Sequence, residues 1–71
     1  MKNYQQHTSN NFNNVSIGDI KESEEGKRKR LVKCKAIYKH IETNEMFALW
    51  QYILAKTLKP SGNSSCYLEK L

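Results

Sequence analysis

The residues of this chain that point most directly to a chemistry are its cations. Residues 27–39, K-R-K-R-L-V-K-C-K-A-I-Y-K, hold seven of the twelve basic residues and no acidic one. Ammonium and guanidinium groups bind phosphates and carboxylates, so the expected partner is anionic, either a nucleic acid or an acidic protein surface. The residues expected to make these contacts are Lys27, Arg28, Lys29, Arg30, Lys33, Lys35 and Lys39.

A β-strand is the element expected to position the second half of this cluster. From Leu31 onward apolar and charged residues nearly alternate, which is the period of a half-buried strand. One parity would pack on a core, and it comprises Val32, Cys34, Ala36 and Tyr38. The other parity is expected to present a row of positive charge to solvent, and it comprises Lys33, Lys35 and Lys39.

The same pattern also has a plainer interpretation. Net charge is +5, but the residues outside 27–39 sum to −2, and several carboxylates precede the basic segment. A lysine row can be a solvated strand face that keeps a small protein soluble and prevents edge pairing. The carboxylates that can neutralise part of the cluster are Asp19, Glu22, Glu24 and Glu25.

Aromatic residues next to the basic segment offer a second chemistry, because aromatic rings stack on nucleic acid bases. Tyr38 lies within the basic strand but on its apolar parity, and Trp50 and Tyr52 share a parity in the following segment. A chain this small needs large aromatic residues for its core. We therefore expect Trp50 to be a core residue.

Catalytic and metal-binding constellations are not expected. The carboxylates fall in predicted loops, and the glycines are scattered, so neither a nucleophile with its base nor a phosphate loop is indicated. The spacings C-x-x-C and H-x-x-x-H are missing among His7, Cys34, His40 and Cys66, although Cys34 and His40 share a parity. We expect no enzyme activity, no metal site and no cofactor.

Size and composition limit the class of protein. Seventy-one residues make one domain, and its mean hydropathy of −0.79 is low for a compact fold. Two cysteines are too few for a disulfide scaffold, and no apolar run follows the first residues as in a secretory signal. The apolar-rich run 46–55 is interrupted by Gln51 and is too short to span a bilayer. We expect a cytoplasmic protein with no membrane partner, and the oligomeric state is not indicated.

The chain divides into a tail and one small domain. Residues 1–14 contain five Asn and two Gln but few large apolar side chains, so they are expected to be a disordered tail. Residues 15–71 are expected to form the domain. Its strand over 29–41 is followed by a short loop, in which Asn44 tolerates the left-handed conformation of a hairpin.

The segment after this loop has two interpretations. As a strand, 46–53 would pair back on the basic strand. As a helix over about 44–58, it would be capped by Thr43 or Asn44 and ended by Lys59-Pro60. The last piece, C-Y-L-E-K-L, alternates like a final strand.

The loop sequence also carries a resemblance. Residues 39–45, K-H-I-E-T-N-E, are similar to the K-H-x-E-T-x-E hairpin signature of a small bacterial family of uncharacterised one-domain proteins. The resemblance covers about residues 26–71, with Trp50 in the family's aromatic place. It departs from the family at Glu69-Lys70, where the family has Arg-Pro, and in an apparent insertion over 52–61. It implies an SH3-like, mainly antiparallel β fold, a strand rather than a helix over 46–53, and no known activity.

The sequence therefore predicts a mainly β protein, a small antiparallel SH3-like barrel or sheet, with an α+β fold carrying a helix over about 44–58 as the alternative. Its expected function is that of a non-enzymatic basic module that binds an anionic partner. The alternative function is that of a small inhibitor or adaptor, which docks on one larger protein through an apolar patch or an edge strand.

Overall fold

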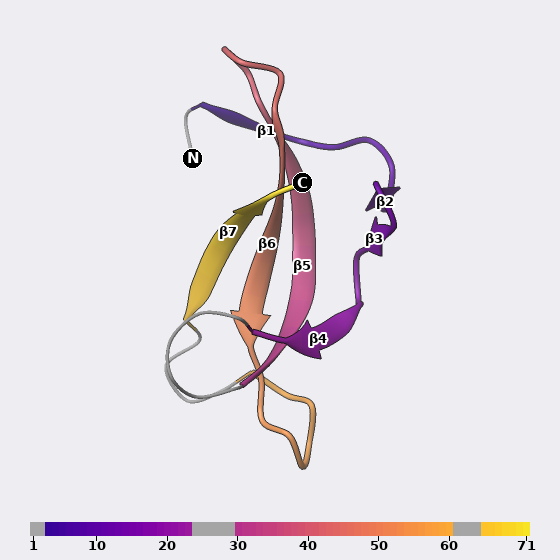
Figure 1. Cartoon of the computed structure of the whole chain (residues 1–71), viewed down its shortest axis with the longest axis vertical. Coiled ribbons are helices and arrows are strands. Elements are labelled where there is room, and N and C mark those ends of the chain that lie inside the picture. Colours follow the sequence, from indigo (N-terminus) through magenta and orange to yellow (C-terminus); the bar gives the residue numbers. More distant parts are fainter. Residues whose placement is uncertain (1–2, 24–29, 61–64) are drawn as a thin grey trace.

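The protein folds as a set of antiparallel strands (Figure 1). The computed structural model describes residues 3–23, 30–60 and 65–71. It contains no helix in these ranges, so the mainly β expectation is confirmed and the alternative helix over 44–58 is wrong. The strands are β1 (Tyr4–Gln6), β2 (Asn11–Phe12), β3 (Val15–Ser16), β4 (Ile20–Glu22), β5 (Leu31–His40), β6 (Met46–Tyr52) and β7 (Cys66–Lys70).

The long strand β5 organises the sheet. Its neighbours follow the order β1-β5-β6-β7, and β4 also pairs with β5. β5 is ten residues long, so β1 and β4 share one of its edges, with β1 beside Tyr38–His40 and β4 beside Leu31–Lys33. Neither β1 nor β4 pairs with β7, so the described pairings do not close a barrel, and the SH3-like topology stays a prediction.

A β-bulge at Lys35 reverses the facing of β5. Cys34 lies opposite Trp50 and Ala36 lies opposite Leu49, so Lys35 is an extra residue with no partner on β6. Residues that share a parity across the bulge consequently face opposite sides of the sheet. The expected row of Lys33, Lys35 and Lys39 on one face is therefore wrong.

The core lies on one side of this sheet, which we call the core face. Its buried residues are Val32, Cys34 and Ile37 from β5 and Ala48 and Trp50 from β6. The expectation for Trp50 is confirmed, since its side chain is 1% exposed. The residues packed against this cluster from other parts of the chain include Phe12, Val15, Tyr67 and Leu71.

The segment expected to be a disordered tail is part of this fold over residues 3–14. β1 pairs with the end of β5, and the amide of His7 donates to the carbonyl of Ile37 at 2.8 Å. Phe12, in the β2–β3 hairpin, packs against the core. The structure differs from the expectation because β1 pairs with a strand far along the chain and the β2–β3 hairpin packs on a distant core, so neither needs a periodic pattern of its own.

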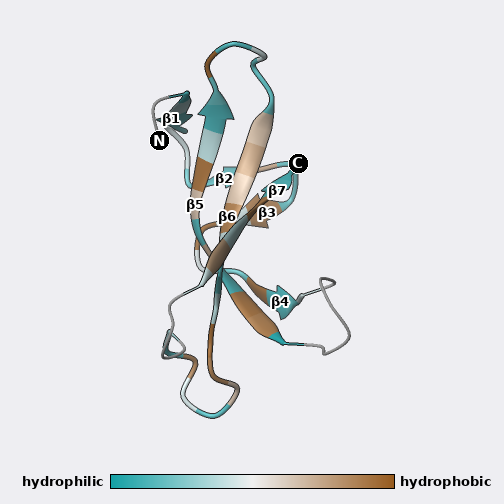
Figure 2. Cartoon of the chain, turned by 90° about the vertical axis from the view of Figure 1, so that its left-hand side faces the viewer, coloured by the Kyte–Doolittle hydropathy of each residue, from teal (hydrophilic) through white to brown (hydrophobic). Residues whose placement is uncertain are grey.

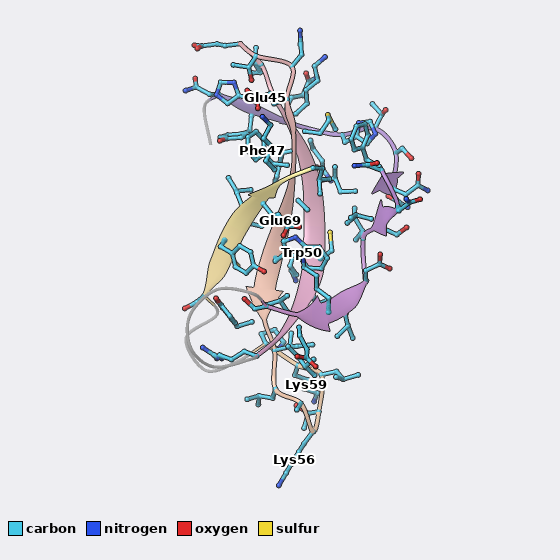
Figure 3. The ribbon with its side chains drawn as sticks, in the orientation of Figure 1. Glu45, Phe47, Trp50, Lys56, Lys59 and Glu69 are labelled. Carbon is cyan, nitrogen blue, oxygen red and sulfur yellow. The ribbon has the colours of Figure 1, made fainter. Side chains whose placement is uncertain are left out.

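An ion pair over Trp50 joins strands from the two edges of the sheet. The Lys21 ammonium on β4 lies 2.8 Å from each carboxylate oxygen of Glu69 on β7 and 4.4 Å from the centroid of the Trp50 ring. Figure 3 shows Glu69 and Trp50 close together at the middle of the sheet. Since β4 pairs with β5 and β7 pairs with β6, this ion pair bridges the core face with its ammonium over the indole.

Two loops at opposite ends of the molecule share one geometry (Figure 1). Between His40 and Glu45, the amide of His40 donates to the carbonyl of Glu45, and the amide of Asn44 donates to the carbonyl of His40, both at 2.8 Å. Between Leu54 and Lys59, the same two bonds recur at 2.9 and 2.8 Å, with Leu58 in the place of Asn44.

The two loops differ at the residue with a left-handed backbone. Asn44 has a φ of 60° and Leu58 has a φ of 57°. Asn tolerates this region well, so the sequence-based expectation for Asn44 is confirmed, whereas a left-handed leucine is strained by about 1 kcal/mol or more. The second loop is thus built at a cost that the first loop avoids.

Deletion of Lys33 should destabilise the domain far more than deletion of Lys35. Without Lys35, Cys34 and Ala36 become neighbours, so the β5–β6 pairs stay in register and the core-facing side chains of β5 stay on the core face. Without Lys33, either Val32 turns away from the core face or the later pairs with β6 are lost, and loss of burial of one large aliphatic side chain costs about 1.5–3 kcal/mol. Urea unfolding should show this loss for the Lys33 deletion alone. Equal losses in the two deletion variants would contradict the bulge.

Exchange of the two left-handed residues should change stability in opposite directions. Leu58→Asn should raise the free energy of unfolding by about 0.5–1 kcal/mol, because it relieves the backbone strain at that position. Asn44→Leu should lower it by a similar amount for the same reason. Urea midpoints of the two variants measure both effects, and a fall in stability for Leu58→Asn would argue against a strained loop.

Candidate functional site

The predicted basic contacts do not gather on one surface. Lys27, Arg28 and Lys29 lie outside the described residues. The Arg30 guanidinium stacks 4.4 Å above the centroid of the Tyr52 ring. Lys35 is exposed at the bulge.

Lys33 and Lys39 emerge on opposite sides of the sheet. Lys33 is half-buried and lies opposite Gln51, on the side away from the core, which we call the outer face. Lys39 is exposed and lies opposite Met46 on the core-face side, because the bulge separates it from Lys33. Of the predicted contacts that the structure describes, Lys33 and, at the bulge itself, Lys35 can therefore add charge near the outer face.

The outer face carries a group of rings that the sequence did not reveal, which we call the ring cluster. It consists of Tyr4, Tyr38, His40 and Phe47, all half-buried. The Tyr4 centroid lies 6.4 Å from that of Tyr38, 5.0 Å from that of His40 and 5.6 Å from that of Phe47. The ring planes meet Tyr4 at 72°, 90° and 83°, which is the favoured edge-to-face arrangement.

Strand pairing explains why these rings meet. β1 places Tyr4 opposite His40, and β6 places Phe47 opposite Tyr38. The bulge turns Tyr38 outward, away from the parity of Val32 and Cys34. The ring cluster thus depends on β1, on the bulge and on the β5–β6 hairpin together.

An aliphatic row continues the outer face beyond the rings. Ala36, Leu49 and Leu68 are cross-strand neighbours on β5, β6 and β7. The next row is polar, with Lys33 opposite Gln51 and Gln51 opposite Cys66. The outer face therefore changes from aromatic to aliphatic to polar from the C-terminal toward the N-terminal end of β5. Figure 2 colours every residue of β5 and shows its C-terminal end, which also carries Lys39 and His40, as hydrophilic.

The charge balance at the ring end of this face is set by one ion pair. The Lys70 ammonium lies 2.6 Å from the Glu45 carboxylate, and this contact holds the pKa of Glu45 below its ordinary value. Lys33, in contrast, has no ion-pair partner among residues 3–23, 30–60 and 65–71. Lys33 is therefore a cation of the outer face that is available to an external anion.

A pocket lies beside β1, where Lys39 emerges. It has a volume of about 320 Å³ and is lined by Gln5, Gln6, His7, Thr8, Lys39 and Met46. Its lining is rich in hydrogen-bond donors, but Gln5 and Lys39 pair on the core-face side. The pocket does not extend the ring cluster.

The two histidines and two cysteines are dispersed. Cys34 and His40, expected on one strand face, lie on opposite faces because the bulge falls between them. In the part of the chain that the structure describes, no three His, Cys, Asp or Glu side chains come together as a metal site would require. That part also lacks any helix that is long and apolar enough to cross a membrane.

The sequence contains one sign of the bulge that turns Tyr38 into the ring cluster. Apolar and charged residues alternate from Val32 to Ala36, and Ile37 and Tyr38 then follow Ala36 as further apolar residues. Such an interruption of period two is typical of a bulge, and a bulge moves every later side chain to the other face. Tyr4 left no such signal, since its strand has only three residues in an Asn- and Gln-rich stretch.

Comparison of the chain with family models, with curated proteins and with solved structures finds no match. The similarity of residues 39–45 to a bacterial hairpin signature stays a prediction.

The two cysteines should react at very different rates. Cys34 is buried, burial raises the pKa of its thiol above 9.0, and its Sγ lies 3.6 Å from the carbonyl of Ala36, whereas Cys66 is exposed. A chromogenic disulfide reagent should titrate one thiol at once and the second only at the rate of opening. Cys66→Ser should remove the fast phase alone, and rapid reaction of both thiols would contradict the burial of Cys34.

The raised thiol pKa also has a consequence at high pH. The unfolded chain releases the Cys34 proton near pH 9.0, while the folded chain retains it. Folding stability should therefore fall as pH rises above about 9. Cys34→Ala should reduce that pH dependence in urea unfolding.

Proposed function

We propose that this protein is a non-enzymatic binding module whose outer face takes single-stranded nucleic acid. The observation that carries the proposal is the half-buried ring cluster of Tyr4, Tyr38, His40 and Phe47, next to the aliphatic row of the outer face. Unpaired bases stack on exposed aromatic side chains, and each stacked base contributes about 1–3 kcal/mol.

The surrounding charges support an anionic ligand. Lys33 lies on the outer face and Lys35 is exposed at the bulge, both on the strand that carries Tyr38. The net charge of +5 attracts a polyanion toward the whole molecule. Contacts from both residues to phosphates would orient a strand along β5.

A single strand fits this face better than a duplex. The bases of a duplex are stacked on one another, so rings on a sheet face do not reach them without strand separation. The cations that would track a duplex backbone are divided by the bulge between two faces. Stacking on rings, assisted by a few phosphate contacts, is the mode that this arrangement favours.

A second candidate function is docking on another protein, as an inhibitor or adaptor. Leu49 and Leu68 form a half-buried aliphatic row, and β7 ends the strand order of the described sheet. The amide of Leu71 donates to the carbonyl of Met46, and the amide of Tyr52 donates to the carbonyl of Ser65. In an antiparallel ladder every second residue bonds to the same neighbour, so the N–H and C=O groups of Leu68 point away from β6. An extended peptide can pair with such an edge.

The proposal includes a cytoplasmic location. Neither Cys34 nor Cys66 is in a disulfide, and Cys66 is exposed. An exposed thiol persists in a reducing compartment.

Binding of fluorescent single-stranded oligonucleotides, measured by anisotropy at several salt concentrations, tests the proposed function. The double variant Tyr38→Leu/Phe47→Leu keeps apolar bulk but removes both ring faces, so its affinity should fall about 10–100-fold. Lys33→Gln should lower the slope of log K against log salt by about 0.7. The matched control Lys39→Gln, on the other face, should bind within about twofold of the wild type.

Two outcomes would count against this function. If the wild type shows no salt-sensitive binding at low ionic strength, the nucleic acid proposal fails and docking on a protein leads. If the ring variant binds as well as the wild type while Lys39→Gln is impaired, the ligand uses the core-face side instead.

A further inference from the structure

The loop between Leu54 and Lys59 contains a residue type that its backbone conformation disfavours. Its hydrogen bonds repeat those of the β5–β6 loop, including a bond from the residue after the turn to a threonine hydroxyl, from Lys59 to Thr57 and from Glu45 to Thr43. Yet Leu58 occupies the left-handed position that Asn44 fills in the first loop. Backbone strain that persists at one position indicates a role other than stability.

The side chains of this loop are exposed and of two kinds. Leu54 is 48% exposed and Leu58 is 46% exposed. Lys56 and Lys59 are exposed, and neither ammonium has an ion pair with any residue that the structure describes. Figure 3 shows both lysines at the end of the molecule to which the loop projects.

The loop at the opposite end of the molecule differs in charge. The β5–β6 loop carries Glu42 and Glu45, of which Glu45 is paired with Lys70, and Figure 3 shows Glu45 far from Lys56 along the long axis. Residues 54–60 contain two lysines and no acidic residue. Of the two loops, the leucine-bearing one is therefore the one that a negatively charged surface attracts.

We propose that residues 54–59 attach the protein peripherally to an anionic lipid bilayer. Leu54 and Leu58 enter the apolar side of the interface, and Lys56 and Lys59 contact headgroup phosphates. Amphipathic segments bind membrane surfaces by this combination of buried apolar area and electrostatic attraction. The expectation of no membrane partner rested on the lack of a spanning segment, and a peripheral contact needs none.

The shape of the loop favours a bilayer over an acidic protein. A stable protein interface buries about 800 Å² on each partner, which a convex loop of six residues does not provide by itself. A fluid interface closes around a projecting loop of any shape. The contact is independent of the ring cluster, which belongs to the outer face near the other end of β5.

Co-sedimentation of the full chain with vesicles tests this proposal. The wild type should bind vesicles of phosphatidylcholine with about 30% phosphatidylserine, and salt or omission of the anionic lipid should weaken binding. Lys56→Gln and Lys59→Gln should each lower the partition coefficient about fivefold. Leu58→Asn should lower it at least about fivefold, although it makes the fold more stable.

The matched control is Ile41→Asn in the other loop, where the isoleucine is 54% exposed. It should leave vesicle binding unchanged, and Leu58→Asn should leave oligonucleotide binding unchanged. No binding of the wild type to anionic vesicles, or equal losses in Leu58→Asn and Ile41→Asn, would overturn the proposal. Binding to soluble polyglutamate but not to vesicles would overturn it as well, and would assign the loop to an acidic protein.

Discussion

Lys35 has no partner on β6, and this one unpaired residue decides what each side of the sheet presents. Before it, even-numbered residues of β5 face the core; after it, odd-numbered residues do so. The bulge thereby buries Ile37 and releases Tyr38 to join Tyr4 and Phe47. The core and the ring cluster are two results of the same irregularity, so a change of register at the bulge alters both.

The core itself depends on one large side chain. Trp50 is almost fully buried, with Cys34 opposite on β5 and Tyr67 opposite on β7. Its indole Nε1 finds no acceptor among the described residues, so apolar contact and the Lys21 ammonium above the ring hold it in place. A small domain has little other apolar area to bury, which explains why several short strands converge on this one ring.

Much of the framework could be predicted from local patterns. Alternation predicts β5 and β7, and the left-handed tolerance of Asn44 predicts the hairpin between β5 and β6. The resemblance, rather than propensity, favoured a strand for β6. The only local sign of the bulge is the run Ala36-Ile37-Tyr38, which interrupts the alternation that begins at Val32. Strict alternation assigns Tyr38 to the core and Lys39 to the face of Lys33, and the bulge reverses both assignments.

Other features had no local signal at all. β1 and the β2–β3 hairpin are too short for a hydrophobic period, and they are ordered by contacts with β5 and the core that lie far away along the chain. The strained leucine of the second loop contradicts the usual residue preference for its backbone. Sequence patterns predict local preferences, whereas β1 and the β2–β3 hairpin are held by contacts with distant residues.

The Lys21–Glu69 ion pair joins positions 48 residues apart, and this distance governs the order of events as the chain is synthesised. β4 has no partner until β5 follows it, and the indole of Trp50 lacks its cover until β7 has been added. Contacts of such long range are slow to form, because the entropy of closing a large loop is lost before the contact energy is gained. Without β7, β6 has one unpaired edge and the core lacks Tyr67 and Leu71, although β5 can already pair with β1, β4 and β6. The lysines on β5 then have a second use, since charges along a strand discourage association with other chains before β6 has paired with it.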